Sequence, residues 1–274
     1  MIVTSRIGRW RAELFAGVTS GLLLALSFPP FPTRFLAAVA LVPVIRYYLR
    51  DGRFPWRRSL ALGFMLGAAF FATLLFWIVK LIPESGATMP WVLGPALAIL
   101  VAYLSCYTAI FTVALSILRN RFGRPALFAA PALWSLVEFA RSHGELGFSW
   151  GVLANALAVY PDAIQGLSVY GPFGLSMVLV FLNLFVAYAF FGTSRRRRLS
   201  AAAAFAVVAC GHLLWGSSEI ARFDRALADA APGDTVALVQ PNVDPGLKWD
   251  PAYRDSLFRQ MEKFTVQASR EGAS

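Results

Sequence analysis

The chain has 274 residues, of which 58% are hydrophobic and only 15% are charged, and its mean hydropathy is +0.60. Soluble domains average roughly 45–50% apolar and about 25% charged residues, so this composition excludes an ordinary soluble domain and indicates an integral membrane protein. The formal net charge of +10 is compatible with nucleic-acid binding, but the basic residues cluster between apolar segments, as they do in membrane proteins. We therefore expect no nucleic-acid partner.

Seven apolar segments approach or reach the roughly 20 residues that a helix needs to cross a bilayer. They cover residues 12–28, 35–49, 60–79, 91–118, 126–140, 171–192 and 201–215. The first resembles a signal peptide, but no small-residue cleavage site follows it, so we expect an uncleaved helix. The second is short and is interrupted by Pro43 and Arg46. The pattern predicts an α-helical polytopic membrane bundle of about seven transmembrane helices over residues 1–220.

Arginines gather in alternate loops of this predicted bundle. Arg46 lies near the end of the second segment, and the loop that follows contains Arg50, Arg53, Arg57 and Arg58. The loops after the fourth and sixth segments contain Arg119, Arg121 and Arg124, and Arg195, Arg196, Arg197 and Arg198. Because cytoplasmic loops carry the excess of Lys and Arg, this alternation predicts a cytoplasmic N-terminus. Seven spans would then place everything after Trp215 on the outer face. In a Gram-negative bacterium this would be a multi-pass protein of the inner membrane with its C-terminal part in the periplasm.

The segment 232–274 has a different pattern, that of an α/β domain. Residues 235–239 form a short β-branched and apolar run, which predicts a buried strand, and Pro241 ends that run. Asp250 and Pro251 fit the N-cap and first position of a helix. Apolar residues then follow at helical spacing, at Tyr253, Leu257, Phe258, Met261 and Phe264. One strand and one helix cannot make a sheet, so we expect this segment to be the incomplete start of such a domain.

Two polar features of the bundle could be functional. Trp134, Glu138 and Arg141 are spaced to share one helical face, and ionisable residues in membrane spans are often functional. Alternatively, Glu138 and Arg141 form a purely structural pair near the helix end. The long loop 142–170 contains Gly147-Phe-Ser-Trp-Gly151, which fits either a functional loop or an aromatic belt at the membrane interface.

No catalytic or metal-binding constellation is recognisable in the sequence. Cys106 and Cys210 lie in predicted helices among apolar neighbours, which is typical of inert buried thiols. His143 and His212 lack metal-ligand spacing, and no phosphate loop or nucleophile elbow is present. We predict no metal, no cofactor and no catalytic residue within this chain.

Several motifs taken in order resemble one family. They are the Ser-Phe-Pro-Pro-Phe sequence that ends at Phe31, Phe76-Trp77, Leu133-Trp-Ser-Leu-Val-Glu-Phe-Ala-Arg141, Gly147-Phe-Ser-Trp150, Tyr170-Gly-Pro-Phe-Gly174, and Val239-Gln-Pro-Asn-Val-Asp-Pro-Gly-Leu-Lys-Trp-Asp250. The last is the most specific. With these motifs the chain resembles the N-terminal half of bacterial apolipoprotein N-acyltransferases.

The resemblance implies a membrane bundle that carries a periplasmic nitrilase-like domain. A Glu–Lys–Cys triad would take an acyl chain from a phospholipid as a thioester and pass it to the α-amino group of a diacylglyceryl-cysteine on an apolipoprotein. The resemblance also implies a monomer, no cofactor, and a triad beyond Ser274, so that this chain alone is inactive. The substrate-binding residues that it suggests are Gly147, Phe148, Trp150, Lys248 and Trp249.

Two alternatives remain from the sequence. One is a related membrane acyltransferase of the nitrilase superfamily with another acceptor. The other is a transporter, which the composition allows, although transporters commonly show internal repeats and no clear repeat is visible here.

Overall fold

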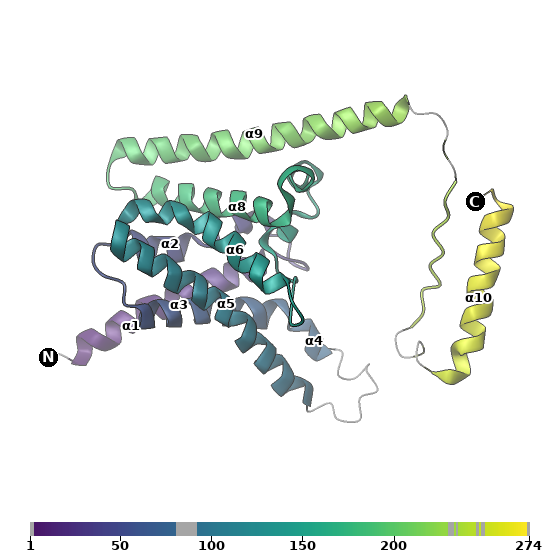
Figure 1. Ribbon diagram of the computed structural model, residues 1–274, viewed down its shortest axis with the longest axis horizontal. Helices are drawn as coiled ribbons and strands as arrows, with labels where there is room; N and C mark the ends of the chain where they lie inside the picture. Colours follow the sequence, from purple (N-terminus) through teal and green to yellow (C-terminus); the bar gives the residue numbers. More distant parts are fainter. Residues whose placement is uncertain are drawn as a thin grey trace. The chain divides into compact units, whose positions relative to one another are not determined.

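The computed structural model describes residues 3–80, 92–229, 233, 235–244, 247 and 250–272, and in these residues helices are the only regular secondary structure (Figure 1). The chain forms two compact units. The first comprises Met1–Phe76 and Ala96–Ala221, and the second comprises Trp77–Pro95 and Arg222–Ser274.

Each of the seven predicted apolar segments contains a helix. In chain order the helices are α1 (Val3–Leu26), η1 (Arg34–Ala38), α2 (Val42–Leu49), α3 (Trp56–Leu74), α4 (Trp77–Lys80), α5 (Leu93–Phe122), η3 (Arg124–Ala129), α6 (Ala130–Ser142), η4 (Leu153–Leu157), α7 (Pro161–Ile164), α8 (Leu167–Phe191), α9 (Arg195–Ala228) and α10 (Pro251–Arg270). Among the described residues, α5, α8 and α9 are long and apolar enough to cross a membrane. This confirms the predicted membrane class at the level of three candidate spans.

Prolines and a glycine explain where the predicted segments break. Pro43 lies in the first turn of α2, so the second segment is a 3₁₀ turn followed by a short helix rather than one helix. In α8 the backbone leaves the helical conformation at Gly171, with φ 65° and ψ −177°, just before Pro172. The expected 142–170 loop is therefore shorter than predicted, because α8 already begins at Leu167 and is kinked at this Gly-Pro pair.

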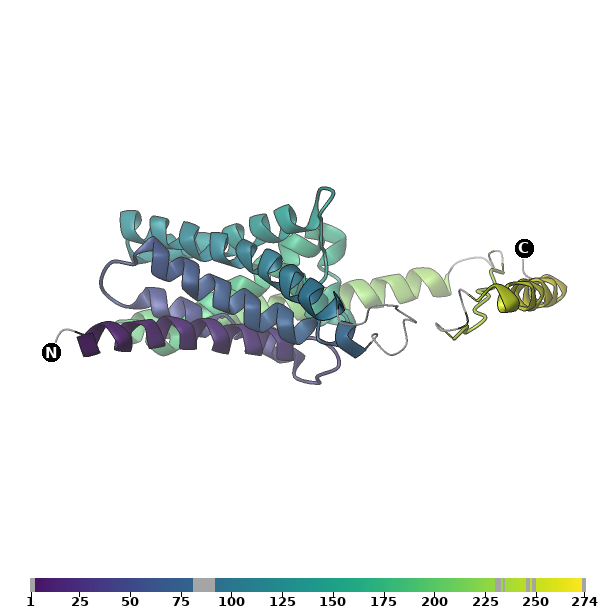
Figure 2. The same ribbon diagram turned by 90° about the horizontal axis from the view of Figure 1, so that it is seen from below.

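Helices α1, α3 and α5 approach one another closely at glycines. Gly17 and Gly21 lie against α3, where an added Cβ at Gly17 would come within 2.5 Å of the Leu62 carbonyl oxygen. Gly63 and Gly67 face α5 in the same way, against Thr108 and Ser105. Both pairs are spaced four residues apart, the spacing that lets helix backbones approach in membranes. Figure 2 shows α1 and α3 side by side along their length.

The close approach of α3 and α5 lets hydroxyl groups bind the backbone of the facing helix. Thr108 Oγ1 donates a hydrogen bond to the Gly63 carbonyl at 2.8 Å, and Thr112 Oγ1 donates to the Ser59 carbonyl at 2.7 Å. Both threonines are buried. Hydrogen bonds between helices of this kind add to the packing contacts that hold membrane helices together.

A buried carboxylate joins α1 to the next two helices. Glu13 is only 2% exposed, and its Oε1 accepts a hydrogen bond from Tyr47 Oη at 3.1 Å and lies 3.5 Å from Arg58 Nη1. A buried charge requires partners of this kind to offset its desolvation. The sequence pattern does not predict this contact, although an acidic residue inside the first apolar segment is a visible signal.

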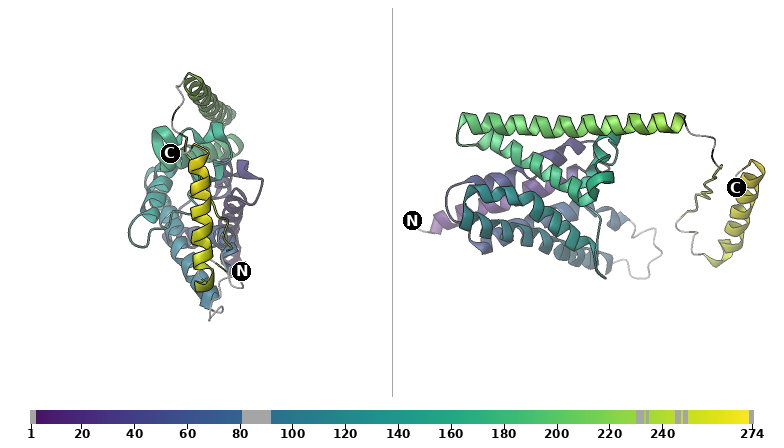
Figure 3. Two further views of the ribbon diagram at one scale, coloured as in Figure 1. Left: turned by 90° about the vertical axis from the view of Figure 1, so that its right-hand side faces the viewer. Right: turned by 45° about the horizontal axis from the view of Figure 1, so that its top comes forward.

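Polar side chains also join α8 and α9 to neighbouring segments. Asn183 in α8 accepts a hydrogen bond from the Leu41 amide at 2.7 Å and donates one to the Ala37 carbonyl at 2.8 Å. His212 in α9 contacts the Ala163 carbonyl through Nε2 and Tyr170 Oη through Nδ1, both at 2.7 Å. Because a carbonyl only accepts, Nε2 carries the proton and the Tyr170 hydroxyl donates. Figure 3 shows α9 beside α8.

In the second unit, the predicted helix is confirmed and the predicted strand is wrong. Asp250 caps α10, because its Oδ1 accepts a hydrogen bond from the Ala252 amide at 2.9 Å, and Pro251 occupies the first turn. Residues 235–239 instead form no strand, and Val236 and Leu238 are 75% and 96% exposed. A strand exists only where a neighbouring strand pairs its backbone, and the described residues provide none.

The predicted burial of the two cysteines is also wrong. Cys106 and Cys210 do lie within α5 and α9, but both are exposed. Apolar neighbours in a membrane helix need not pack against protein, because lipid tails are as apolar as the side chains themselves. Their apolar surroundings in the sequence therefore did not show which way they face.

The glycine contacts predict a position-dependent effect of one methyl group. Gly63→Ala should lower the free energy of unfolding by about 1–3 kcal/mol, because its Cβ would overlap Thr112 and the Thr108 carbonyl. Gly211→Ala in α9 meets no atom within 4 Å, so it should be neutral or stabilising by up to about 1 kcal/mol. Denaturant unfolding of the purified chain in micelles measures both, and equal effects would contradict close α3–α5 packing.

Candidate functional site

The candidate site lies where α6 ends and the following loop folds back over the helix. Glu138 and Arg141 are each only 3% exposed, and Trp134 is also buried. Trp134 packs edge-on against Phe111 of α5, with ring centroids 5.1 Å apart. The predicted common face of α6 is therefore real, and it points into the protein.

Glu138 binds the backbone of the segment that follows the loop. Its Oε1 accepts a hydrogen bond from the Leu153 amide at 2.8 Å. The next amide, that of Ala154, donates to Ser176 Oγ of α8 at 3.1 Å. The start of η4 is thus held between α6 and α8, which satisfies two amides at a helix start that has no side-chain cap of its own.

Arg141 binds two carbonyls of the same loop. Its Nη1 donates to the carbonyl oxygens of Phe148 and Trp150, at 2.7 and 2.6 Å, and the Phe148 amide donates back to the Arg141 carbonyl at 2.7 Å. The guanidinium group lies 5.3 Å from the centre of the Phe71 ring. Hydrogen bonds from a charged donor are stronger than neutral ones, so Arg141 fixes the path of the loop.

Glu138 and Arg141 therefore do not contact each other directly, but both bind the backbone of the same loop. Both side chains are fully described, and no salt bridge joins them; each instead binds backbone groups of residues 148–153. We call this arrangement the α6 clamp. The sequence indicated that the two residues share a face, but it could not show that the backbone partner comes from the next loop.

Two glycines let the loop fit under the clamp. A side chain at Gly147 would meet the Ser142 and Gly144 carbonyl oxygens at 2.9 Å. Gly151 has φ +76°, a conformation that favours glycine, and a Cβ added there would meet Leu74 and the Phe70 ring of α3. The Gly-Phe-Ser-Trp-Gly motif is therefore a turn whose first and last residues must be small.

The clamp presents two aromatic side chains at the end of the helices. The rings of Phe148 and Trp150 lie 5.7 Å apart, and Trp150 is half exposed. Tyr103 of α5 reinforces the loop, since its hydroxyl donates to the Leu146 carbonyl at 3.1 Å and contacts Tyr107 Oη at 2.9 Å. The sequence analysis did not single out these tyrosines, although their i, i+4 spacing was visible.

The interior of the clamp is too small for a substrate. The crevice lined by Trp134, Glu138, Arg141 and Gly151 has a volume of about 10 Å³, which has room for one water at most. Any ligand contact must therefore be made by the outer surface of the loop, where Phe148 and Trp150 lie.

No catalytic arrangement is present in the described part of the chain. His143 and His212 contact backbone carbonyls or Tyr170, Cys106 Sγ contacts the Ala102 carbonyl at 3.3 Å, and no histidine lies within hydrogen-bond reach of a cysteine or serine. No cluster of metal-ligating side chains occurs in the same residues. The structure brings Gly147, Phe148 and Trp150 together, while Lys248 and Trp249 lie outside the described residues.

The clamp predicts a local effect of losing Arg141. Arg141→Ala should raise hydrogen exchange of the amides in residues 147–151 by about tenfold or more, because two charge-assisted hydrogen bonds are lost. Glu145→Ala, an exposed residue of the same loop, should change nothing. Hydrogen-exchange mass spectrometry of the purified chain measures both, and unchanged exchange in Arg141→Ala would show that other contacts hold the loop.

Comparison with known proteins places this site in a family. Residues 20–185 match the family model of the apolipoprotein N-acyltransferase N-terminal domain. The apolipoprotein N-acyltransferase of Geobacter metallireducens is 28% identical over 269 residues, covering 96% of this chain and 50% of that protein. The corresponding enzyme of Allorhizobium ampelinum is 30% identical, covering 94% and 48%. The chain spans about half the length of the curated relatives it matches, and it belongs to the apolipoprotein N-acyltransferase family.

Proposed function

We propose that this chain supplies the membrane domain of an apolipoprotein N-acyltransferase, an enzyme that moves an acyl chain from a phospholipid to the α-amino group of a diacylglyceryl-cysteine. The observation that carries the proposal is the family match over residues 20–185. The α6 clamp supports it, because Gly147, Phe148, Glu138 and Arg141 belong to two of the motifs that the sequence shares with the family.

The proposed chemistry is two-step acyl transfer. A cysteine thiolate attacks the ester carbonyl of the phospholipid, the acyl–oxygen bond breaks, and the released lysophospholipid hydroxyl takes a proton from the acid–base glutamate. The acceptor amine then attacks the thioester, gives up its proton to the same glutamate, and releases the cysteine thiolate, which restores the starting state. A lysine stabilises the oxyanion in both steps.

We place that triad outside residues 1–274. Cys106 and Cys210 are poor candidates for the nucleophile, because each lies within an apolar helix and contacts no base among the described residues. An activated cysteine needs an adjacent base or positive charge. The chain by itself should therefore be inactive.

The role that we propose for the α6 clamp is to hold a lipid-contacting aromatic edge. An acyl chain must leave the bilayer to reach a soluble-domain thiolate, and large amphipathic rings at the interface can shield it on the way. Phe148 and Trp150 are held for this role by Arg141. We extend the same role to Lys248 and Trp249, which share the 239–250 motif.

The proposal includes seven spans with a cytoplasmic N-terminus, in a bacterial inner membrane. The alternating arginines support this orientation, and it puts loop 143–152 and residues after α9 on the periplasmic side. A periplasmic position for the loop is needed if it is to guide a chain toward a periplasmic domain.

Cysteine labelling tests the orientation. In a background in which Cys106 and Cys210 are replaced by Ser, Glu145→Cys should react with a membrane-impermeant maleimide in intact spheroplasts, and Arg196→Cys should react only after permeabilisation. Both positions are exposed on the protein surface, so burial within the protein does not prevent the maleimide from reaching them. The reverse labelling pattern would refute the orientation and, with it, the proposed role of the loop.

Acyl transfer tests the function. The chain alone, given phospholipid and a diacylated lipopeptide, should form no triacylated product, whereas a fusion to the C-terminal half of the Geobacter metallireducens relative should. In that fusion Trp150→Ala should reduce the rate about tenfold or more, on the scale of one lost positioning contact, with an unchanged melting temperature. Robust product from the chain alone, or a monodisperse but inactive fusion, would contradict the proposal.

A further inference from the structure

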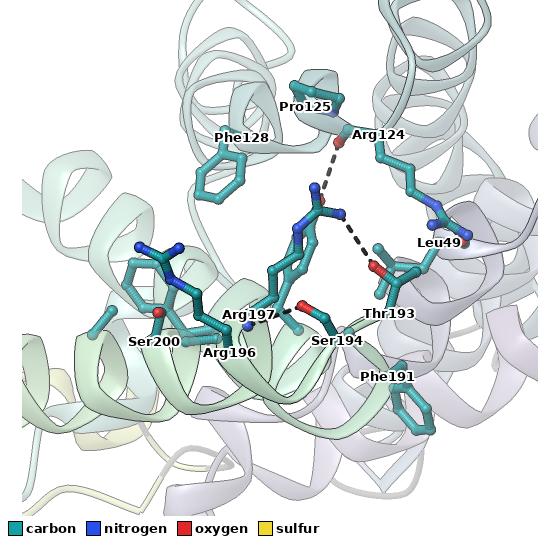
Figure 4. Close-up of a pocket in the computed structure, with 15 residues that line it drawn as sticks. Leu49, Arg124, Pro125, Phe128, Phe191, Thr193, Ser194, Arg196, Arg197 and Ser200 are labelled. Atoms are coloured by element: carbon teal, nitrogen blue, oxygen red, sulfur yellow. Dashed lines mark hydrogen bonds between the residues drawn. The ribbon is translucent and has the colours of Figure 1, made fainter.

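The end of the first unit opposite the α6 clamp contains a large basic cavity. Helix α8 begins near the clamp at Leu167 and ends at Phe191, which separates the two regions by roughly 35 Å along the helix. The cavity has a volume of about 640 Å³ and lies where α8 ends and α9 begins. We call it the basic pocket; Figure 4 shows it with its lining residues.

The lining of the basic pocket combines polar and apolar groups. Arg124, Arg196, Arg197, Thr193, Ser194 and Ser200 supply its polar groups. Its apolar lining includes Phe128 and Phe185, and Phe128 stacks on Tyr188 with ring centroids 5.6 Å apart. This combination of cations beside apolar surface matches a molecule with an anionic head and a hydrocarbon tail.

The positive charge of the pocket lining is incompletely neutralised. No carboxylate lines the pocket, and the nearest ion pair joins Arg124 to Asp51 at 3.1 Å, with Asp51 itself 93% exposed. Arg197 contacts only neutral oxygen, through Nη1 to Thr193 Oγ1 at 3.1 Å, and reaches across the pocket in Figure 4. Three arginines thus share one carboxylate, which leaves two positive charges facing the cavity.

The position of the pocket relative to the apolar helices identifies the kind of ligand. Leu167–Phe191 and Arg195–Ala228 are both candidate membrane spans, and the pocket lies at the connection between them. A span end is the level of the lipid headgroups. A soluble anion needs no apolar lining, and a neutral lipid needs no arginines. Basic pockets between membrane helices on the cytoplasmic side favour anionic lipid headgroups.

We propose that the basic pocket binds an anionic phospholipid, with the phosphate between Arg196 and Arg197 and an acyl chain along Phe128 and Phe185. Guanidinium groups suit phosphate because they donate several hydrogen bonds in a fixed plane. This lipid is separate from any acyl donor, because it lies at the other end of the helices. Its binding would join α8, α9 and η3, which together with Leu49 of α2 line the pocket.

Lipid binding to the purified, detergent-solubilised chain tests this proposal. Phosphatidylglycerol should raise the melting temperature and appear as a bound adduct in native mass spectrometry, and phosphatidylcholine with the same acyl chains should do neither. The double variant Arg196→Gln/Arg197→Gln should bind phosphatidylglycerol about tenfold or more weakly, since arginines attract anionic lipid headgroups.

A matched variant separates the pocket from net charge. Arg53→Gln/Arg195→Gln removes the same two charges from exposed positions outside the pocket lining, and it should bind as the parent chain does. Equal weakening in both double variants would show that only surface charge attracts the lipid and would overturn the proposal. Inorganic phosphate and glycerol 3-phosphate should not change the melting temperature. If either stabilised the chain as much as the lipid does, the pocket would be a site for a small anion, and the lipid proposal would be overturned.

One more variant keeps the test decisive if the arginine changes disturb folding, which size-exclusion chromatography and circular dichroism would reveal. Ala204→Phe narrows the apolar lining and leaves every charge in place. It should also lose phosphatidylglycerol binding, and unchanged binding in a folded Ala204→Phe chain would overturn the proposal. None of these outcomes depends on acyl transfer, so the lipid site can fail while the proposed enzyme function stands.

Discussion

The close approach of α1, α3 and α5 is the constraint on which the first unit depends. Four glycines, Gly17, Gly21, Gly63 and Gly67, leave no room for a Cβ between these helices. Because lipid tails are as apolar as the helices, the hydrophobic effect does not drive helix association in a membrane. Close packing and interhelical hydrogen bonds must provide the stabilisation. The small residues provide the packing, and the Thr108 and Thr112 hydroxyls then reach the facing backbone.

The same principle explains why several buried polar residues of this unit bind backbone groups of other segments. Asn183 joins α8 to the backbone around η1 and α2, and Arg141 and Glu138 hold the loop after α6. Irregular backbone near a membrane must have its amides and carbonyls satisfied by protein. The polar side chains in the helices therefore set the shape of the non-helical segments, including the loop after α6 that presents Phe148 and Trp150.

The two ends of the unit have different chemistry. At one end the α6 clamp exposes aromatic rings on a rigid turn, and at the other the basic pocket presents arginines above an apolar lining. Both features combine a polar and an apolar part, as expected where a helix bundle meets the membrane surface. In our proposals the first guides an acyl chain, and the second binds a lipid that stays in place.

The sequence by itself determined the membrane class, the positions of the helices, the Asp250 cap of α10 and the family, because these depend on local composition, spacing and motif order. It could not determine the partners of Glu13, Glu138 and Arg141, the exposure of Cys106 and Cys210, or the cavity at Arg196 and Arg197. It also wrongly predicted a strand at residues 235–239. Only the tertiary structure decided these points, because burial, strand pairing and cavities depend on segments that are distant in the chain, and local pattern carries no information about which segments meet.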